Sequence, residues 1–211
     1  MDTVTPAQVL DDVLARVGPR LAAGGYRKSA RTFAAIADGV ARAVIFQTSQ
    51  LKKPDEATFT LSLLVTAIPF HEAYTGKAFP KNAASGEPVV QASIGRLMPD
   101  GEEIWWSLKP GVSSALIARE IDTLLTEVVL PFLARFQSGD ALLAELSENG
   151  DALPGFVAMR ERCRAVLLAA RGRKTEAGAA LSALLEANAA EGLEGFRDSV
   201  HQLAKRIGVK L

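Results

Sequence analysis

The chain of 211 residues has one cysteine and two histidines, and its net charge is zero. A single cysteine, Cys163, excludes an intramolecular disulfide and any cysteine-rich metal site. With only His71 and His201 besides it, a zinc site built mainly from cysteine and histidine would lack ligands. We therefore expect no metal site and no cofactor.

Other absences bear on the class of protein. Lysine plus arginine total 24, as do aspartate plus glutamate, so the basic excess typical of nucleic-acid binding is missing. No apolar run reaches the roughly 18 to 20 residues that span a bilayer. The opening MDTVTPAQVL carries acid rather than base, unlike a signal peptide. The motifs GxxxxGK[ST], GxGxxG and GxSxG are also absent. These features predict a cytoplasmic protein that does not bind membranes, and they leave nucleic-acid binding only to a local basic patch.

What is present centres on a predicted β-hairpin, Thr32 to Gln50, in which two apolar runs flank the turn dipeptide Asp38-Gly39. Thr58 to Ile68 then alternates between apolar and mainly threonine or serine positions, as a strand with one polar face does. Val89 to Leu97 and Ile104 to Leu108 predict two more strands. The pattern indicates an antiparallel β-meander of about five strands.

Helices are expected on both sides of this meander. Thr5, Pro6 and Gln8 have the spacing of an N-cap, a first-turn proline and a capping box, and Gly24-Gly25 ends the helix. A long helix begins at Ser113 or Ser114, and Pro131 should kink or break it near Val129.

From Ser138 onward alanine and leucine dominate, and apolar spacings of three and four predict further helices. These are expected at 140–146, 156–171, 175–190 and 193–207. We therefore expect an α+β fold with a sheet domain, residues 1–138, and an all-helical C-terminal extension, residues 139–211.

The order of several short motifs resembles one bacterial family. Gly25-Tyr26-Arg27-Lys28 is followed by a strand ending in Gln47-Thr48-Ser49, then by Ser93-Ile94-Gly95-Arg96-Leu97, then by Trp105-Trp106 and a closing helix. Over residues 6 to 137 this resembles the DUF4304 family, a domain of unknown function. The resemblance implies a small α+β domain and no established activity.

The predicted sheet offers a possible contact surface. Trp105 and Trp106 are adjacent, so on a strand they face opposite sides, and one of them could line a groove. Gln47 and Thr60, with other threonines of the alternating strand, could form a polar floor, and the alternative is a plain solvated face.

Residues 69–88 form a second candidate, because an irregular connection of twenty residues is uncommon inside a compact domain. His71 beside Glu72, with Tyr74 nearby, could act as an acid or base. The alternative is an ordinary surface loop, since no HExxH helix is present.

Cys163 and two basic clusters have simpler explanations. The helical spacing of Cys163 fits a buried core residue better than a reactive thiol. Tyr26 to Arg31 reads as a basic connector, and Arg160 to Lys174 contains a second basic cluster among acidic residues. Either cluster could meet an acidic partner, but for the second we expect a solvated, salt-bridged surface.

Three functions follow, in order of preference. The first is a non-enzymatic protein-interaction module, toxin-neutralising or regulatory by analogy with other small bacterial domains. The second is a small-molecule-binding protein or enzyme that uses the 69–88 connection and the polar sheet face. The third is nucleic-acid binding through the arginine-rich helix.

Overall fold

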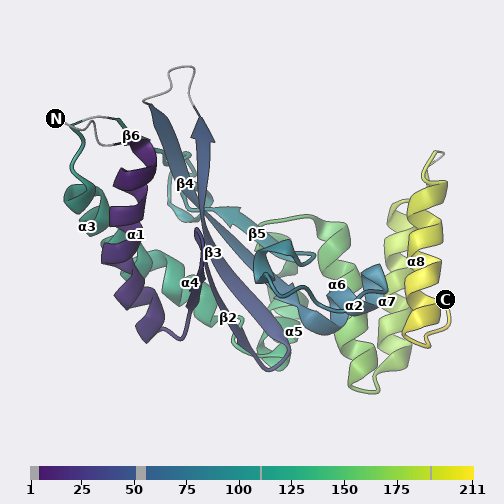
Figure 1. Cartoon of the computed structure of the whole chain (residues 1–211). Helices are drawn as coiled ribbons and strands as arrows, with labels where there is room; N and C mark the ends of the chain where they lie inside the picture. Colours follow the sequence, from purple (N-terminus) through teal and green to yellow (C-terminus); the bar gives the residue numbers. More distant parts are fainter. Residues whose placement is uncertain (1–4, 51–55, 110, 191) are drawn as a thin grey trace. The chain divides into compact units, whose positions relative to one another are not determined.

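The computed structural model describes residues 5–109, with a gap at 51–55, and residues 111–211, with a gap at 191. The chain is α+β, as predicted: an N-terminal helix, a six-stranded sheet and a C-terminal helical region. The strands are β1 (Arg27–Ser29), β2 (Thr32–Ala37), β3 (Val40–Gln50), β4 (Ala57–Ala67), β5 (Val90–Ser93) and β6 (Trp106–Leu108). The α-helices are α1 (Pro6–Ala23), α2 (Ile68–Thr75), α3 (Ser114–Leu124), α4 (Leu130–Ala134), α5 (Gly139–Glu148), α6 (Val157–Ala170), α7 (Lys174–Ala187) and α8 (Glu194–Arg206) (Figure 1).

The chain forms two compact units. Unit 1 comprises Met1–Ala35, Arg42–Leu64 and Gln91–Ala134; unit 2 comprises Ile36–Ala41, Val65–Val90 and Arg135–Leu211. Each unit is thus built from segments distant in the sequence. The division into domains at residue 138 remains a prediction, because compactness alone does not show that a segment folds independently.

The sheet has the predicted meander order, β1-β2-β3-β4-β5, and β6 pairs with β4 as well. The β2–β3 turn has positive φ at Asp38 (44°) and Gly39 (74°), which is why this dipeptide marks the hairpin. Strand β1 lies in the segment predicted as a basic connector. That prediction was wrong because its three residues form a strand only through antiparallel pairing with β2, which local pattern does not report.

In unit 1, α1 begins as predicted. Thr5 accepts a hydrogen bond from the Gln8 backbone N–H, and the Gln8 side chain caps in return. Pro19 lies inside the helix, which continues to Ala23. The apolar stripe of α1 is buried, and Gly18 lies against the ring of Phe33, so α1 covers the sheet face that carries Phe33. Figure 1 shows α1 and α3 on that side of the sheet.

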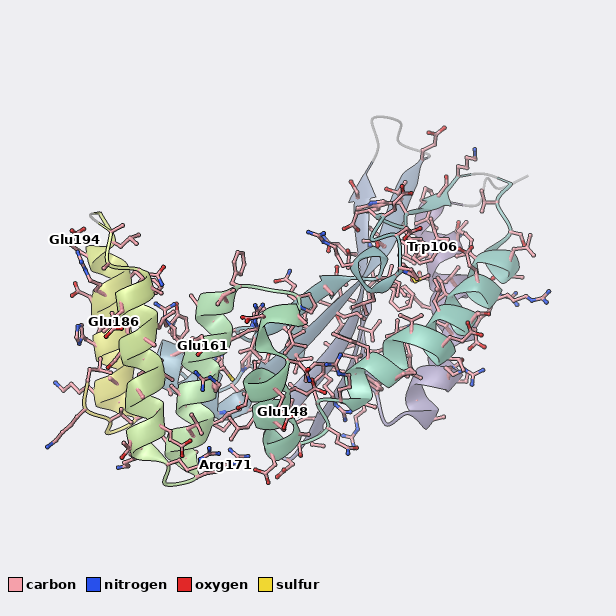
Figure 2. The ribbon with its side chains drawn as sticks, turned by 180° about the vertical axis from the view of Figure 1, so that it is seen from behind. Trp106, Glu148, Glu161, Arg171, Glu186 and Glu194 are labelled. Carbon is pink, nitrogen blue, oxygen red and sulfur yellow. The ribbon has the colours of Figure 1, made fainter. Side chains whose placement is uncertain are left out.

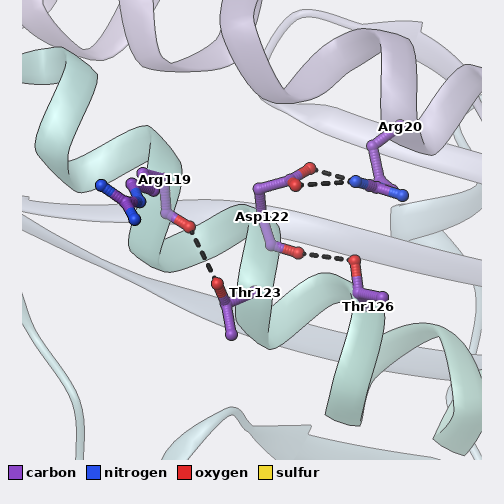
Figure 3. A network of polar contacts seen from close by, with 5 residues as sticks. All are labelled: Arg20, Arg119, Asp122, Thr123 and Thr126. Atoms are coloured by element: carbon purple, nitrogen blue, oxygen red, sulfur yellow. Dashed lines mark hydrogen bonds and ion pairs between the residues drawn. The ribbon is translucent and has the colours of Figure 1, made fainter.

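The helix that closes unit 1 is irregular where Pro131 predicted a break. Ser113 caps α3, and a π-helical segment, η3 (Leu125–Val129), separates α3 from α4. Arg20 of α1 makes a two-pronged ion pair with Asp122 of α3, both contacts being 2.8 Å long. Figure 3 shows this pair beside the hydroxyls of Thr123 and Thr126, which donate to backbone carbonyls one turn earlier.

The prediction of a long irregular loop at residues 69–88 was wrong. This segment contains helix α2 and a 3-10 turn, η1 (Ala83–Ser85). Pro69 stands in the first turn of α2, and Gly76 ends the helix with φ of 71°. The prolines and glycines that suggested irregular structure are in part the start and stop signals of a short helix.

In unit 2, α6 packs against α5, α7 and α2, and α8 packs against α7 and α2. The C-terminal helices predicted from spacing are therefore confirmed within about two residues at most ends. Cys163 is buried in α6, as predicted.

Candidate functional site

The two tryptophans have different environments in unit 1. Trp106, which is labelled in Figure 2, is 5% exposed. Its ring stacks on Phe59 with ring centroids 5.2 Å apart, at the end of a row of aromatic rings that includes Phe46 and Phe33. Trp105 is 46% exposed. Trp106 is therefore a core residue on the α1 side, and Trp105 is the tryptophan that can make a contact.

Strand register places other predicted residues on the side of Trp105. Phe59 on β4 pairs with Trp106 on β6 in antiparallel register. Thr60, which follows Phe59, therefore lies opposite Trp105, the residue just before β6. Side chains alternate along extended chain, so both face away from the aromatic row. On the same side, the Ser62 hydroxyl donates to Gln47 Oε1 at 2.8 Å. We call Gln47, Thr60, Ser62 and Trp105 the Trp105 face.

The floor of this face is less open than its polarity predicted. Gln47 is exposed and Ser62 half-buried, but Thr60 is only 3% exposed, and its hydroxyl has no hydrogen-bond partner among the described residues. Thr66, further along β4, is also buried. The plain solvated face, which was the alternative to a polar floor, is therefore not found at these two positions, because both threonines are buried.

The approach to Trp105 depends on Gly95. Gly95 begins a 3-10 turn, η2 (Gly95–Leu97), and a Cβ built there would lie 2.0 Å from the carbonyl oxygen of Glu102. Only a glycine lets the segment leading to the tryptophans pass so closely. In addition, the Ser93 hydroxyl donates to Glu103 Oε1 at 2.7 Å. The Ser93–Leu97 motif thus fixes the chain that presents Trp105.

His71 and Glu72 do not form an acid–base pair in unit 2. His71 is 6% exposed, its Nδ1 accepts from the backbone N–H of Glu87 at 3.1 Å, and its ring meets Phe79 edge-on. Glu72 is exposed and accepts from the N–H of Phe79 at 3.4 Å. Each side chain instead accepts a hydrogen bond from a backbone N–H of the segment that follows α2.

Tyr74 belongs to a packing cluster of unit 2 rather than to the Trp105 face. Its ring stacks on Phe70, and the Arg162 guanidinium lies 5.5 Å from its centroid. Arg162 is 4% exposed, lies 4.4 Å from the centroid of Phe196 and donates to Ser199 Oγ at 2.7 Å. Among the described contacts of Arg162, two aromatic faces stabilise its charge.

The expected solvated arginine surface on α6 is therefore only partly present. Arg164 pairs with Glu161 as predicted, but Arg160 and Arg162 are buried, and burial lowers the pKa of both guanidinium groups. The prediction failed for these two because their stems pack like apolar side chains. Burial likewise raises the pKa of the Cys163 thiol, which makes it a poor nucleophile.

Two absences hold for the described part of the chain. Residues 5–50, 56–109, 111–190 and 192–211 contain no cluster of three or more His, Cys, Asp or Glu side chains that could hold a metal ion. Over those same ranges no helix has the length and apolar character needed to cross a membrane.

Comparison with known proteins gives one result. Residues 17–135 match the model of a family described as "Domain of unknown function (DUF4304)". The match contains the whole Trp105 face and ends before α5. No curated protein and no solved structure matches the chain.

Proposed function

The chain belongs to the DUF4304 family, and from its own side chains we propose that it is a protein-interaction module whose contact surface is the Trp105 face. The observation that carries this proposal is the contrast between two adjacent tryptophans, one in the core and one 46% exposed. Tryptophan is strongly enriched among the residues that dominate binding energy at protein interfaces. An exposed tryptophan ring does not contribute the hydrophobic stabilisation that its burial would give to the fold.

Rigid support of Trp105 favours a contact role over incidental exposure. The residue follows a segment that is packed on Gly95 and tied to Ser93, and it precedes a core tryptophan. Such anchoring keeps the ring in one place before a partner arrives, which reduces the entropy cost of binding. The hydroxyl and amide of Ser62 and Gln47 would contribute the polar contacts usual beside an aromatic anchor.

Site-specific photo-crosslinking in the source cell tests the proposal. A benzoylphenylalanine at position 47 reports contacts at the Trp105 face, and the same group at Leu116, an exposed apolar residue on α3, is the matched control. We expect a discrete adduct from position 47 that disappears with Trp105→Ala, and none from position 116.

Equal adducts from both positions, or an adduct that survives Trp105→Ala, would contradict the proposal. The fold of each variant is checked by its thermal unfolding midpoint, because the part of Trp105 that is not exposed packs on the protein and its loss must be separated from loss of the contact.

A further inference from the structure

Unit 1 contains a groove on the sheet face opposite to Trp105. Its volume is about 300 Å³, at the lower end of the range for small-molecule sites. The apolar part of its lining comes from α1, β4 and β6: Pro6, Ala7, Leu10, Ala57 and Leu108. The remaining described lining residues are Arg31 and Thr48.

Among the described residues that line this groove, the charge is positive and is carried by Arg31. The Arg31 guanidinium donates to Thr48 Oγ1 at 2.9 Å and is half-exposed. Glu56, the acid next to Ala57 in the chain, is not among the residues that line the groove. Arg27 and Lys28, on the exposed edge strand β1, add to the positive potential.

We propose that this groove binds a carboxylate carried on a short apolar chain, with Arg31 pairing with the carboxylate and the apolar wall covering the chain. The two planar N–H donors of a guanidinium match the two oxygens of a carboxylate, and such charge-assisted bonds are stronger than neutral ones. The volume corresponds to about ten water molecules in the liquid, roughly the size of octanoate.

The same chemistry has two sources, a free aliphatic acid and the C-terminal carboxylate of a protein that ends in an apolar residue. Isothermal titration with octanoate, and with a short peptide ending in leucine, distinguishes them. The neutral isosteres octanamide and the amidated peptide are the controls. We expect at least one acid to bind about tenfold more tightly than its amide.

Variants locate the site. Arg31→Gln should abolish the preference for acid over amide, and Ala7→Trp, at an exposed rim position, should block binding by filling the groove. Arg27→Gln removes a nearby exposed charge that does not line the groove and should change affinity less than about twofold. Unfolding midpoints of all three variants exclude misfolding.

If octanoate binds, the ligand of the groove is a free aliphatic acid. If the peptide binds and octanoate does not, the ligand is the C terminus of a protein. Failure of both acids, equal affinity for acid and amide, or an Arg27→Gln loss as large as that of Arg31→Gln overturns the proposal. None of these results depends on the Trp105 face, so each proposal can fail without the other.

Discussion

Replacement of Gly95 by alanine tests how Trp105 is presented. The added Cβ would lie 2.0 Å from the Glu102 carbonyl oxygen and 2.8 Å from the carbonyl carbon of Glu102 and from Glu103 Cα. Cβ contacts under 3.0 Å are essentially never seen, so this backbone would have to move by about 1 Å. No side chain can rotate away, because all three atoms belong to the main chain.

Overpacking of this kind costs typically about 1–3 kcal/mol, and for rigid backbone we expect about 3 kcal/mol of the free energy of unfolding. Gly95 does not have a positive φ, so steric contact alone accounts for the loss. Urea denaturation followed by circular dichroism measures it, and tryptophan fluorescence reports displacement of residues 105 and 106.

Gly150→Ala is the matched control. Gly150 also lacks a positive φ, and an added Cβ there meets no atom within 4 Å, so its free energy of unfolding should change by less than about 0.5 kcal/mol. If Gly95→Ala were as stable as the control and kept the native fluorescence, the reasoning about the Ser93–Leu97 motif would be refuted.

Four further predictions follow from the described contacts. Acrylamide should quench Trp105 and not Trp106, so Trp105→Phe leaves a poorly quenched protein and Trp106→Phe, if folded, a well-quenched one. The hydrogen-bonded ion pair with Arg20 lowers the pKa of Asp122 in the folded protein. The pair therefore stabilises the fold at pH values above the pKa that Asp122 has in the unfolded chain, and this stabilisation is lost as pH falls through the lower pKa of the folded protein. Asp122→Asn should therefore flatten the acid side of a plot of unfolding free energy against pH, an effect that high salt reduces. Cys163, buried with a raised pKa, should react with Ellman's reagent only as fast as the protein unfolds. Arg162→Ala should lower the free energy of unfolding by about 3 kcal/mol, whereas Arg162→Met, which keeps the stem, should cost less than half as much in the same assay.

The sequence was informative where structure is set by neighbouring residues. Thr5 and Gln8 cap a helix through bonds three residues apart, and Asp38-Gly39 turns a hairpin through its own positive φ angles. Pro131 likewise lies two residues after the end of an irregular helical segment. These features depend on local chemistry, so their residue types were sufficient to predict them.

Long-range contacts decided the remainder. Alternation showed that Trp105 and Trp106 face opposite sides, but only the position of α1 shows which side is covered. Residues 69–88 are rich in prolines and glycines, which predicted a loop, yet Pro69 lies in the first turn of helix α2 and Gly76 ends it. The burial of Arg162 between aromatic rings depends on Phe196, a residue of another helix.

The proposed contact role of Trp105 is tested most directly by its oxidation in the complex captured through position 47. Hydroxyl-radical footprinting with mass spectrometry compares the oxidation rate of Trp105 in the free protein and in the complex, with Leu116 as the internal reference. We predict at least a severalfold slower oxidation of Trp105 in the complex and no change at Leu116. Unchanged oxidation of Trp105 would contradict its assignment as the anchor of the interface.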